Sequence, residues 1–348
     1  MKTLKRKILI IGGSGALGKE LTHALNDVFG DYLELYIGDY DEKRGMQTTA
    51  AMPRSKFCLV DGRNLQQVQQ AIVDIDCVIV AFRQKEPVIQ KACFQEKVIC
   101  IDLCAFQAFA DKVQQLDEEK DSLSVVMAGF FPGLSGVIAT SLAEEFETVE
   151  KVSVGLLQNS QAQAGSTGIM DMLKIINMPL NEKTKGFTNK REMTFFHSKY
   201  PVYEIQHDEK VVLQKKLQLK AVHYWTSWNN PKLNNIASWL VKRNLLLKFS
   251  KLFIFFQQRE KKADEERAYL NIKVTGTKFS ERHSTQIEIS AKSDYSMTAF
   301  YVAMIADKAF ISKKVGVCYP FEMMELSDFN YFDYDSYFKI KRYERELS

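Results

Sequence analysis

The chain has 348 residues, 46% hydrophobic and 26% charged, a composition typical of a globular protein with room for about two domains. Its net charge of only +4, without any nucleic-acid-binding motif, argues against a nucleic-acid partner. Because it shows no signal peptide, no long uncharged apolar run and no metal-binding spacing among its six cysteines, we expect a reduced, cytoplasmic protein without a metal site.

An apolar strand over residues 7–11 opens a series of strands that alternate with helices. The first helix is expected over 18–24. The later elements are strands at 31–41, 55–61, 76–82, 97–103 and 123–130, and helices at 64–72 and 87–97. This alternation predicts an α/β fold with a doubly wound, Rossmann-type parallel sheet. We expect that domain to cover residues 1–130.

The pattern changes after residue 130, where alternating segments are separated by turns rather than by regular helices. These segments are 151–157, 192–198, 202–206, 217–225, 268–276 and 284–292. They predict a second, α+β domain over 131–295, built on a mixed or antiparallel sheet with one open face. Residues 296–310 have apolar positions at helical spacing and are expected to form a helix.

A glycine-rich segment, GSGALG, lies between the first strand and the first helix and matches the pattern G-x-G-x-x-G. In this context the first glycine allows the turn, the second lets the backbone approach a pyrophosphate, and the third allows close packing. We predict a dinucleotide-binding turn, with a purely structural turn as the alternative. The residues expected to line it are Gly13, Ser14, Gly15, Ala16, Leu17 and Gly18.

An acidic residue ends the second strand, about twenty residues after the glycines, where a carboxylate binds the ribose hydroxyls. This residue, Asp39, would repel a 2′-phosphate and slightly favours NAD, whereas Lys43 and Arg44 could bind the phosphate of NADP. Tyr40 is expected to line the same site. Asp61, which closes the third strand, either contacts the adenine or caps the following helix.

Four stretches resemble the saccharopine dehydrogenase-like oxidoreductases, a family that includes saccharopine reductase and carboxynorspermidine dehydrogenase. They are IIGGSGALGKEL, ACFQEKVICIDLC, MAGFFPGLSGVIA, and DYSMTAFYVAMIADKAF followed by KKVGVCYPFEM. The resemblance implies an NAD- or NADP-dependent enzyme that transfers a hydride at a carbon–nitrogen bond of an amino-acid- or polyamine-derived small-molecule substrate. It also implies a homodimer formed through the second domain, and a chain end, 296–348, that completes the first domain.

The same resemblance assigns residues to the nicotinamide end of the coenzyme site: Ala81, Phe82, Phe131, Pro132 and Gly133. Arg83 departs from the family's small turn after the fourth strand. It binds a substrate carboxylate, blocks a disused cofactor site, or is an exposed structural arginine. Asp102 ends the fifth strand and is our candidate for proton transfer or amine binding, with a helix cap or a solvated acid as the alternative.

In the second domain, Ser166 and Thr167 of the segment QAGSTGIM either bind a substrate carboxylate or cap a helix. His197 and His223 lie in aromatic segments. They either face a substrate cleft or are structural.

Residues 232–263 form an unusual cationic and apolar insert. The apolar residues that can share one helical face are Ile236, Trp239, Leu240, Leu247 and Phe253. We expect packing within the domain or against a dimer partner; a lid over an apolar cleft and contact with an anionic membrane surface are alternatives. Two other functions remain open. The altered turn at Arg83 suits a non-catalytic dinucleotide sensor or scaffold, and the insert suits a reductase for a lipid-like substrate.

Overall fold

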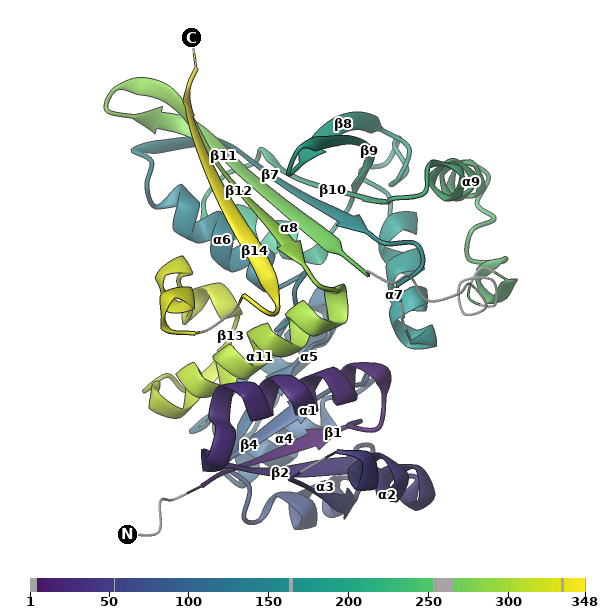
Figure 1. The fold of residues 1–348 in the computed structure, drawn as a ribbon, viewed down its shortest axis with the longest axis vertical. Coiled ribbons are helices and arrows are strands. Elements are labelled where there is room, and N and C mark those ends of the chain that lie inside the picture. Colours follow the sequence, from purple (N-terminus) through teal and green to yellow (C-terminus); the bar gives the residue numbers. More distant parts are fainter. Residues whose placement is uncertain are drawn as a thin grey trace. The chain divides into compact units, whose positions relative to one another are not determined.

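Two seven-stranded sheets organise the part of the chain that the computed structural model describes, which comprises residues 5–52, 54–162, 165–252, 254, 266–332 and 335–347 (Figure 1). The chain divides into two compact units, each with one sheet. The first contains Met1–Leu134 and Thr298–Met324, and the second contains Ser135–Met297 and Glu325–Ser348.

The first sheet is parallel throughout, with the strand order β13-β6-β5-β4-β1-β2-β3. Its strands are β1 Arg6–Ile11, β2 Leu33–Asp39, β3 Ser55–Leu59, β4 Cys77–Val80, β5 Ile99–Asp102, β6 Leu123–Val125 and β13 Gly316–Cys318. The order reverses between β1 and β4, which is where ligands bind in folds of this kind. The predicted Rossmann-type sheet is confirmed, and β13 adds a strand that the sequence analysis did not identify.

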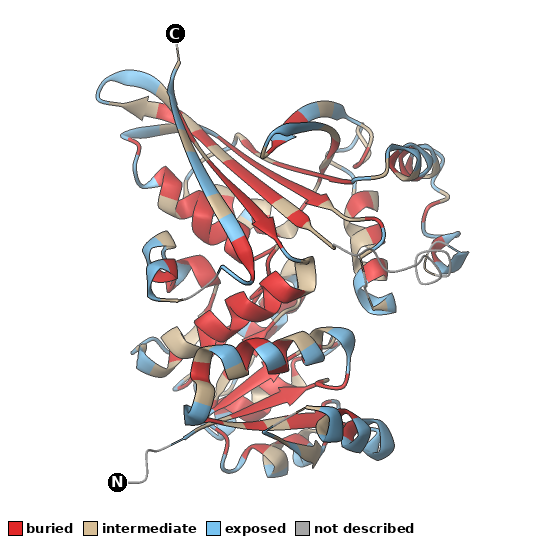
Figure 2. Ribbon diagram, in the orientation of Figure 1, coloured by how far each residue is buried: buried red, intermediate tan, exposed pale blue. Residues whose placement is uncertain are grey.

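Helices cover this sheet because its central strands are apolar on both faces. The helices are α1 Ala16–Phe29, α2 Glu42–Ala51, α3 Leu65–Ile72, α4 Val88–Gln95, α5 Gln107–Gln114 and the long α11 Asp294–Ile311. On one face, Leu9 and Val78 pack with Val68 of α3 and Ile89 of α4. Figure 2 shows the strands at the centre of this sheet as buried.

The second sheet is mixed, with the order β14-β12-β11-β7-β10-β9-β8, in which only β7 and β10 are parallel neighbours. Its strands are β7 Thr148–Gln158, β8 Lys190–Phe195, β9 Ser198–Ile205, β10 Val222–Trp228, β11 Ala268–Lys278, β12 Glu281–Ala291 and β14 Phe338–Glu346. The helices around it are α6 Leu134–Ala143, α7 Ser166–Asn177, α8 Asp208–Lys216 and α9 Pro231–Lys242. The predicted α+β architecture with a mixed sheet is confirmed.

The face of this sheet that was expected to be open is partly covered by the hairpin β8–β9. Met193 and Phe195 of β8 pack with Leu157 of β7 and Trp225 of β10. Gly155 makes room for this contact, since a Cβ atom there would lie 2.1 Å from the sulfur of Met193. The hairpin continues the sheet from β10, and the sheet curls so strongly there that β8 lies over β7 and β10.

The last strand, β14, belongs to the second unit, whereas the sequence analysis assigned the whole of 296–348 to the first domain. It pairs antiparallel with β12 along nine residues, at the edge of the second sheet (Figure 1). Only the segment up to Met324 remains with the first unit. The chain end thus divides between the two units, with Thr298–Met324, which includes β13, in the first and β14 in the second.

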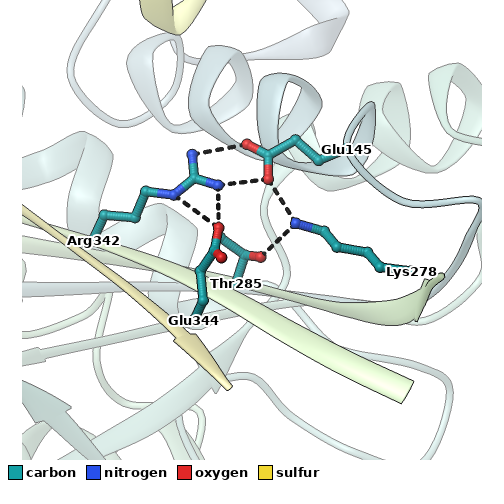
Figure 3. Close-up of polar contacts among 5 residues, drawn as sticks. All are labelled: Glu145, Lys278, Thr285, Arg342 and Glu344. Atoms are coloured by element: carbon teal, nitrogen blue, oxygen red, sulfur yellow. Dashed lines mark hydrogen bonds and ion pairs between the residues drawn. The ribbon is translucent and has the colours of Figure 1, made fainter. Parts of the chain in front are cut away.

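Ionic contacts help to fix β14 on the second unit (Figure 3). Glu145, which follows α6, accepts hydrogen bonds from Arg342 of β14 at 2.8 and 2.6 Å and from Lys278 of β11 at 2.7 Å. Arg342 also contacts Glu344 at 2.5 Å, and Lys278 donates to Thr285 at 3.0 Å. Burial would raise the pKa of Glu145, but the two cations hold it below its ordinary value.

The insert at 232–263 is not one continuous amphipathic helix. Its helix α9 ends at Lys242, and Asn244 has a φ of +59°, a conformation that cannot continue the helix. The buried side of α9 contains Asn234, Ala237, Ser238 and Val241, and Leu247 lies beyond the end of the helix. Ile236 and Trp239 are instead 55% and 49% exposed. Residues 253 and 255–263, including Phe253, lie outside the described residues.

Within the described part of the chain, the helices all fall short of the length and apolarity needed to cross a bilayer.

Candidate functional site

The glycine turn, residues 12–18, follows β1 directly and leads into α1. The amides of Gly12 and Gly13 donate to the carbonyl oxygen of Gly38 at 2.9 and 3.2 Å, which ties the turn to β2. Gly12 has a φ of +88°, so it, and not Gly13, provides the left-handed turn that the sequence analysis assigned to the first glycine of the pattern. The two adjacent glycines in IIGGSG are the sequence signal that could have indicated the positive φ at Gly12.

The other glycines of the turn keep helix and strand in close contact. A Cβ atom at Gly13 would lie 2.9 Å from a side-chain carbon of Ile37, and one at Gly18 would lie 2.3 Å from the carbonyl oxygen of Gly13. Gly15 differs, because its nearest neighbour would be the carbonyl oxygen of Gly12 at 3.3 Å. Space is therefore left beside Gly15, at the start of α1.

Unpartnered donors surround that space. Gly15 is the N-cap of α1, and no side chain caps the helix there. The first amides of a helix have no acceptor within the helix itself. The hydroxyl of Ser14 is buried beside them, and its hydrogen bond to the carboxylate of Asp39 helps to lower the pKa of that acid. Together with the positive end of the helix dipole, these groups fit the pyrophosphate of a dinucleotide.

Asp39 ends β2 next to the turn, but an arginine covers its carboxylate. Arg44 donates to its two oxygens at 3.1 and 2.6 Å, and the amide of Asp41 donates at 2.9 Å. The Asp39 side chain is 2% exposed, whereas that of Arg44 is 48% exposed. Burial would raise the pKa of Asp39, and these hydrogen bonds lower it below its ordinary value. A ribose would therefore meet the guanidinium before the carboxylate.

A second arginine lies close to the first, around the ring of Tyr40. The guanidinium carbons of Arg44 and Arg63 lie 5.1 and 5.4 Å from the centre of that ring. Arg63 also pairs with Asp61 at 2.8 and 2.9 Å. The cap of α3 is Asn64 and not Asp61, so that alternative for Asp61 is wrong. Arg63 is thus the second cation beside Tyr40. The sequence analysis did not identify it, because its pairing with Asp61 is not apparent from the sequence.

The loop after β4 lies against the glycine turn. The amide of Ala81 donates to the carbonyl oxygen of Ile11 at 2.9 Å. Phe82 lies close to both Gly12 and Gly62, where added Cβ atoms would lie 3.3 and 2.7 Å from its side chain. These contacts bring the loops after β1, β3 and β4 together at the carboxyl edge of the sheet.

Arg83 is exposed, and its guanidinium carbon lies 4.6 Å from the centre of the Phe106 ring. Phe106 is the N-cap residue of α5, which follows β5. The contact therefore connects the loops after β4 and β5 and holds a cation at this edge of the sheet.

The carboxylate of Asp102 is completely buried. It accepts hydrogen bonds from Gln84 at 2.9 Å, from Gln90 at 2.6 Å and from the amide of Cys104 at 2.6 Å. Burial raises its pKa to about 6 even though these hydrogen bonds lower it. Asp102 is neither a helix cap nor a solvated acid. It fixes the loop that includes Arg83, which makes it a positioning residue.

This buried acid predicts a specific pH dependence. Because its folded-state pKa of about 6 lies above the ordinary value of 3.8, the folded protein binds this proton more tightly than the unfolded chain. The contribution of Asp102 to stability should therefore rise as the pH falls through 6, by about 1 kcal/mol between pH 7 and pH 5. Burial lowers the pKa of His207 to about 3, so this histidine opposes the gain in every variant that retains it. Urea unfolding at both pH values should therefore show the gain from Asp102 as the difference between the wild type and Asp102→Asn. Asp61→Asn should keep it, and an equal gain in Asp102→Asn would contradict the assignment.

The loop after β6 contains the remaining residues predicted for the coenzyme site. The amide of Gly129 donates to the carbonyl oxygen of Pro132 at 2.9 Å, and Gly133 has a φ of +122°. Phe131 is partly exposed, whereas Pro132 and Gly133 are buried. The amide of Ala128 donates to the carbonyl oxygen of Asp102 at 3.0 Å, so this loop is joined to the end of β5.

The second unit does not bring its predicted substrate residues together. His197 is exposed at the turn of the hairpin β8–β9, where Lys341 contacts its Nε2 at 2.9 Å. His223 lies near the other end of β9 and pairs with Glu204 at 2.8 Å. Ser166 and Thr167 are exposed in the first turn of α7, whose N-cap is Gly165, so the expectation that they cap the helix is wrong. Among the described residues, no group of histidine, cysteine and acidic side chains could hold a metal ion.

Comparison with known proteins gives similarity in structure only. No protein-family model matches the sequence, and neither does any curated protein. The fold is similar to apo saccharopine dehydrogenase (L-Glu forming) from Saccharomyces cerevisiae, with a TM-score of 0.65 and 10% identity over 97% of this chain and 100% of that one. It is similar to C. glutamicum DAP dehydrogenase in complex with DAP, with a TM-score of 0.53 and 10% identity over 93% and 95%. An engineered D-amino acid dehydrogenase bound to NADP+ has a TM-score of 0.51 and 10% identity over 94% and 99%. The resemblance inferred from the sequence is thus confirmed for the fold.

Proposed function

We propose that this chain is an NAD(P)-dependent dehydrogenase that acts at the carbon–nitrogen bond of an amino-acid-derived substrate. The main support is the start of α1 beside the glycine turn, where no side chain caps the first backbone amides of the helix. The three similar structures, all named as dehydrogenases of amino-acid-type compounds, support the same class of reaction. When bound, the nicotinamide ring would accept or donate the hydride.

Each part of the edge of the first sheet has a role in this proposal. The glycine turn would hold the pyrophosphate, Ala81 and Phe82 would line the adjoining wall, and Phe131 to Gly133 would lie near the nicotinamide end. Arg83, stacked on Phe106, would bind a substrate carboxylate. Asp102 would keep that loop in position without touching the substrate.

The coenzyme would be NADP rather than NAD. The sequence slightly favoured NAD because a free carboxylate at Asp39 would repel a 2′-phosphate. That carboxylate is already paired with Arg44, whose more exposed guanidinium would face the ribose. A 2′-phosphate would gain a cationic partner at Arg44, whereas a 2′-hydroxyl would first have to displace it.

The glycine turn provides the test of this function. In Gly15→Ala the added methyl group would fill the space at the start of α1 while making only a 3.3 Å contact with the protein. We expect an unchanged Tm and binding of NADPH, measured by reduced-nicotinamide fluorescence, that is weaker by about tenfold, or ~1.4 kcal/mol. Gly165→Ala, at the uncapped N-cap of α7, is the matched control and should bind NADPH normally. Equal binding by wild type and Gly15→Ala would contradict the site.

A non-catalytic dinucleotide-binding protein is the second candidate. Asp102, the predicted proton-transfer group, is completely buried and would not contact a substrate. Oxidation of NADPH in the presence of mixed amines and keto acids would decide between the two. Turnover supports the dehydrogenase, and binding without turnover supports the sensor or scaffold. The expected homodimer can be tested on the same protein by light scattering.

A further inference from the structure

A row of polar side chains crosses three strands of the second sheet. Ser153 of β7 is directly paired with His223 of β10 on one side and with Lys273 of β11 on the other. Residues paired across neighbouring strands project to the same face of a sheet. This is the face over which the hairpin β8–β9 bends, and the three side chains lie beside the edge of that hairpin.

An arginine from the hairpin reaches down to this row. Arg191 of β8 donates to the hydroxyl of Ser153 at 2.5 Å, and its guanidinium carbon lies 4.0 Å from the centre of the Trp225 ring. The Nε of Arg191 and the indole nitrogen of Trp225 are buried and have no partner among the described residues. Each of these two nitrogens therefore has an N–H donor without a hydrogen-bond acceptor in the described structure.

Further cations surround Lys273. Burial lowers the pKa of Lys273, and so do the charges of Arg345, Arg191 and Lys151, in that order. Among the described residues, Lys273, Lys151 and Arg345 have no carboxylate partner within ion-pair distance. Four cations from four strands thus repel one another on this face.

The carboxylates on the same face are already engaged by other groups. Glu204 accepts from Asn189 at 3.1 Å and contacts His223 at 2.8 Å. Glu288 is buried and accepts from the amide of Phe196 at 2.7 Å, from Gln286 at 2.7 Å and from Asn271 at 3.2 Å. Glu204 also attracts Arg191, but neither carboxylate is bonded to Lys273, so the charge of Lys273 is left for an external anion.

We propose that this face binds the oxyanion group of a small molecule, a carboxylate or a phosphate, between Lys273 and Arg191 and next to the hydroxyl of Ser153. A guanidinium and an ammonium facing one oxyanion form short, charge-assisted hydrogen bonds. Binding would also relieve the repulsion among the four cations. All of these residues lie in the second unit, whereas the glycine turn lies in the first.

Thermal unfolding of the full chain without coenzyme tests the proposal. We expect inorganic phosphate or glutarate to raise the Tm saturably, beyond the effect of sodium chloride at equal ionic strength. Lys273→Met should weaken this binding about tenfold or more. It should not lower the ligand-free Tm, because it removes a repelling charge. Lys199→Met, which alters an exposed lysine paired with Thr194 on the opposite face, is the matched control and should behave like the wild type. Lys273→Arg should retain binding.

Each outcome has a definite meaning. A response to glutarate alone would identify a carboxylate ligand, and a response to phosphate alone would identify a phosphate. The proposal is wrong if sodium chloride reproduces the full rise, if neither anion raises the Tm, or if Lys273→Met responds like the wild type. NADPH binding by Lys273→Met should be unchanged, so failure of this site and failure of the coenzyme site can be told apart.

Discussion

Gly18→Ala is expected to destabilise the first unit strongly and to abolish coenzyme binding with it. Alanine is normally the better residue within a helix, by about 1 kcal/mol. Here its Cβ atom would lie 2.3 Å from the carbonyl oxygen of Gly13, and neither backbone can move without separating α1 from β1. We expect a loss of about 3 kcal/mol in the free energy of unfolding. Thermal unfolding should show this as a Tm lower by roughly 10 °C.

Gly15→Ala is the informative partner of that variant, because the two glycines lie three residues apart and differ in what surrounds them. Gly15→Ala should bind the coenzyme about tenfold more weakly at full stability, whereas Gly18→Ala should lose both binding and stability. If Gly18→Ala unfolded at the wild-type temperature, the close packing of helix and strand would be wrong. If both variants bound NADPH normally, the turn would be only structural.

Arg44→Ala should reverse the coenzyme preference. Removing the guanidinium takes away the partner of the 2′-phosphate, which should weaken NADPH binding by about 2 kcal/mol, or roughly thirtyfold. It also uncovers the carboxylate of Asp39, now 2% exposed, for the ribose hydroxyls, so NADH should bind more tightly than it does to the wild type. Parallel fluorescence titrations with NADH and NADPH measure both changes.

Two further variants check the reason for that reversal. Lys43→Ala removes a neighbouring exposed cation that has no ion-pair partner in the described structure, and it should change either affinity only slightly. Arg44→Ala combined with Asp39→Ala should lose the gain in NADH binding. A wild type that already prefers NADH would contradict the proposed role of Arg44, as would an equal loss for both coenzymes in Arg44→Ala.

The glycine turn and the strands of the first sheet could be predicted because their signals are local. An apolar run such as Ile8–Ile11 followed by glycines has one common structural explanation, and the spacing to Asp39 follows from one strand–helix–strand unit. The positive φ at Gly12 was within reach of the same argument, since two adjacent glycines were available for the turn.

The partners of the charged residues could not be predicted in this way. Arg44 was recognised as a possible phosphate ligand, but its pairing with Asp39 depends on how α2 starts after β2. Asp102 was placed correctly at the end of β5, yet its burial depends on Gln84 and Gln90 from another loop and helix. His197 and His223 both lie in aromatic segments, so the sequence could not distinguish their roles. The fold places them near different ends of β9.

By itself the sequence determined the six strands β1 to β6 of the first sheet and their alternation with helices, the mixed character of the second sheet, and the position of the glycine turn. These follow from the periodicity of apolar residues and from turn residues, which act within a few positions along the chain. Only the tertiary structure decided that β14 joins the second sheet, that Arg44 covers Asp39, and that Lys273 and Arg191 approach one row of the sheet. Those outcomes depend on register and on charges from distant segments, whose energies are set by burial and distance in space rather than by spacing in sequence.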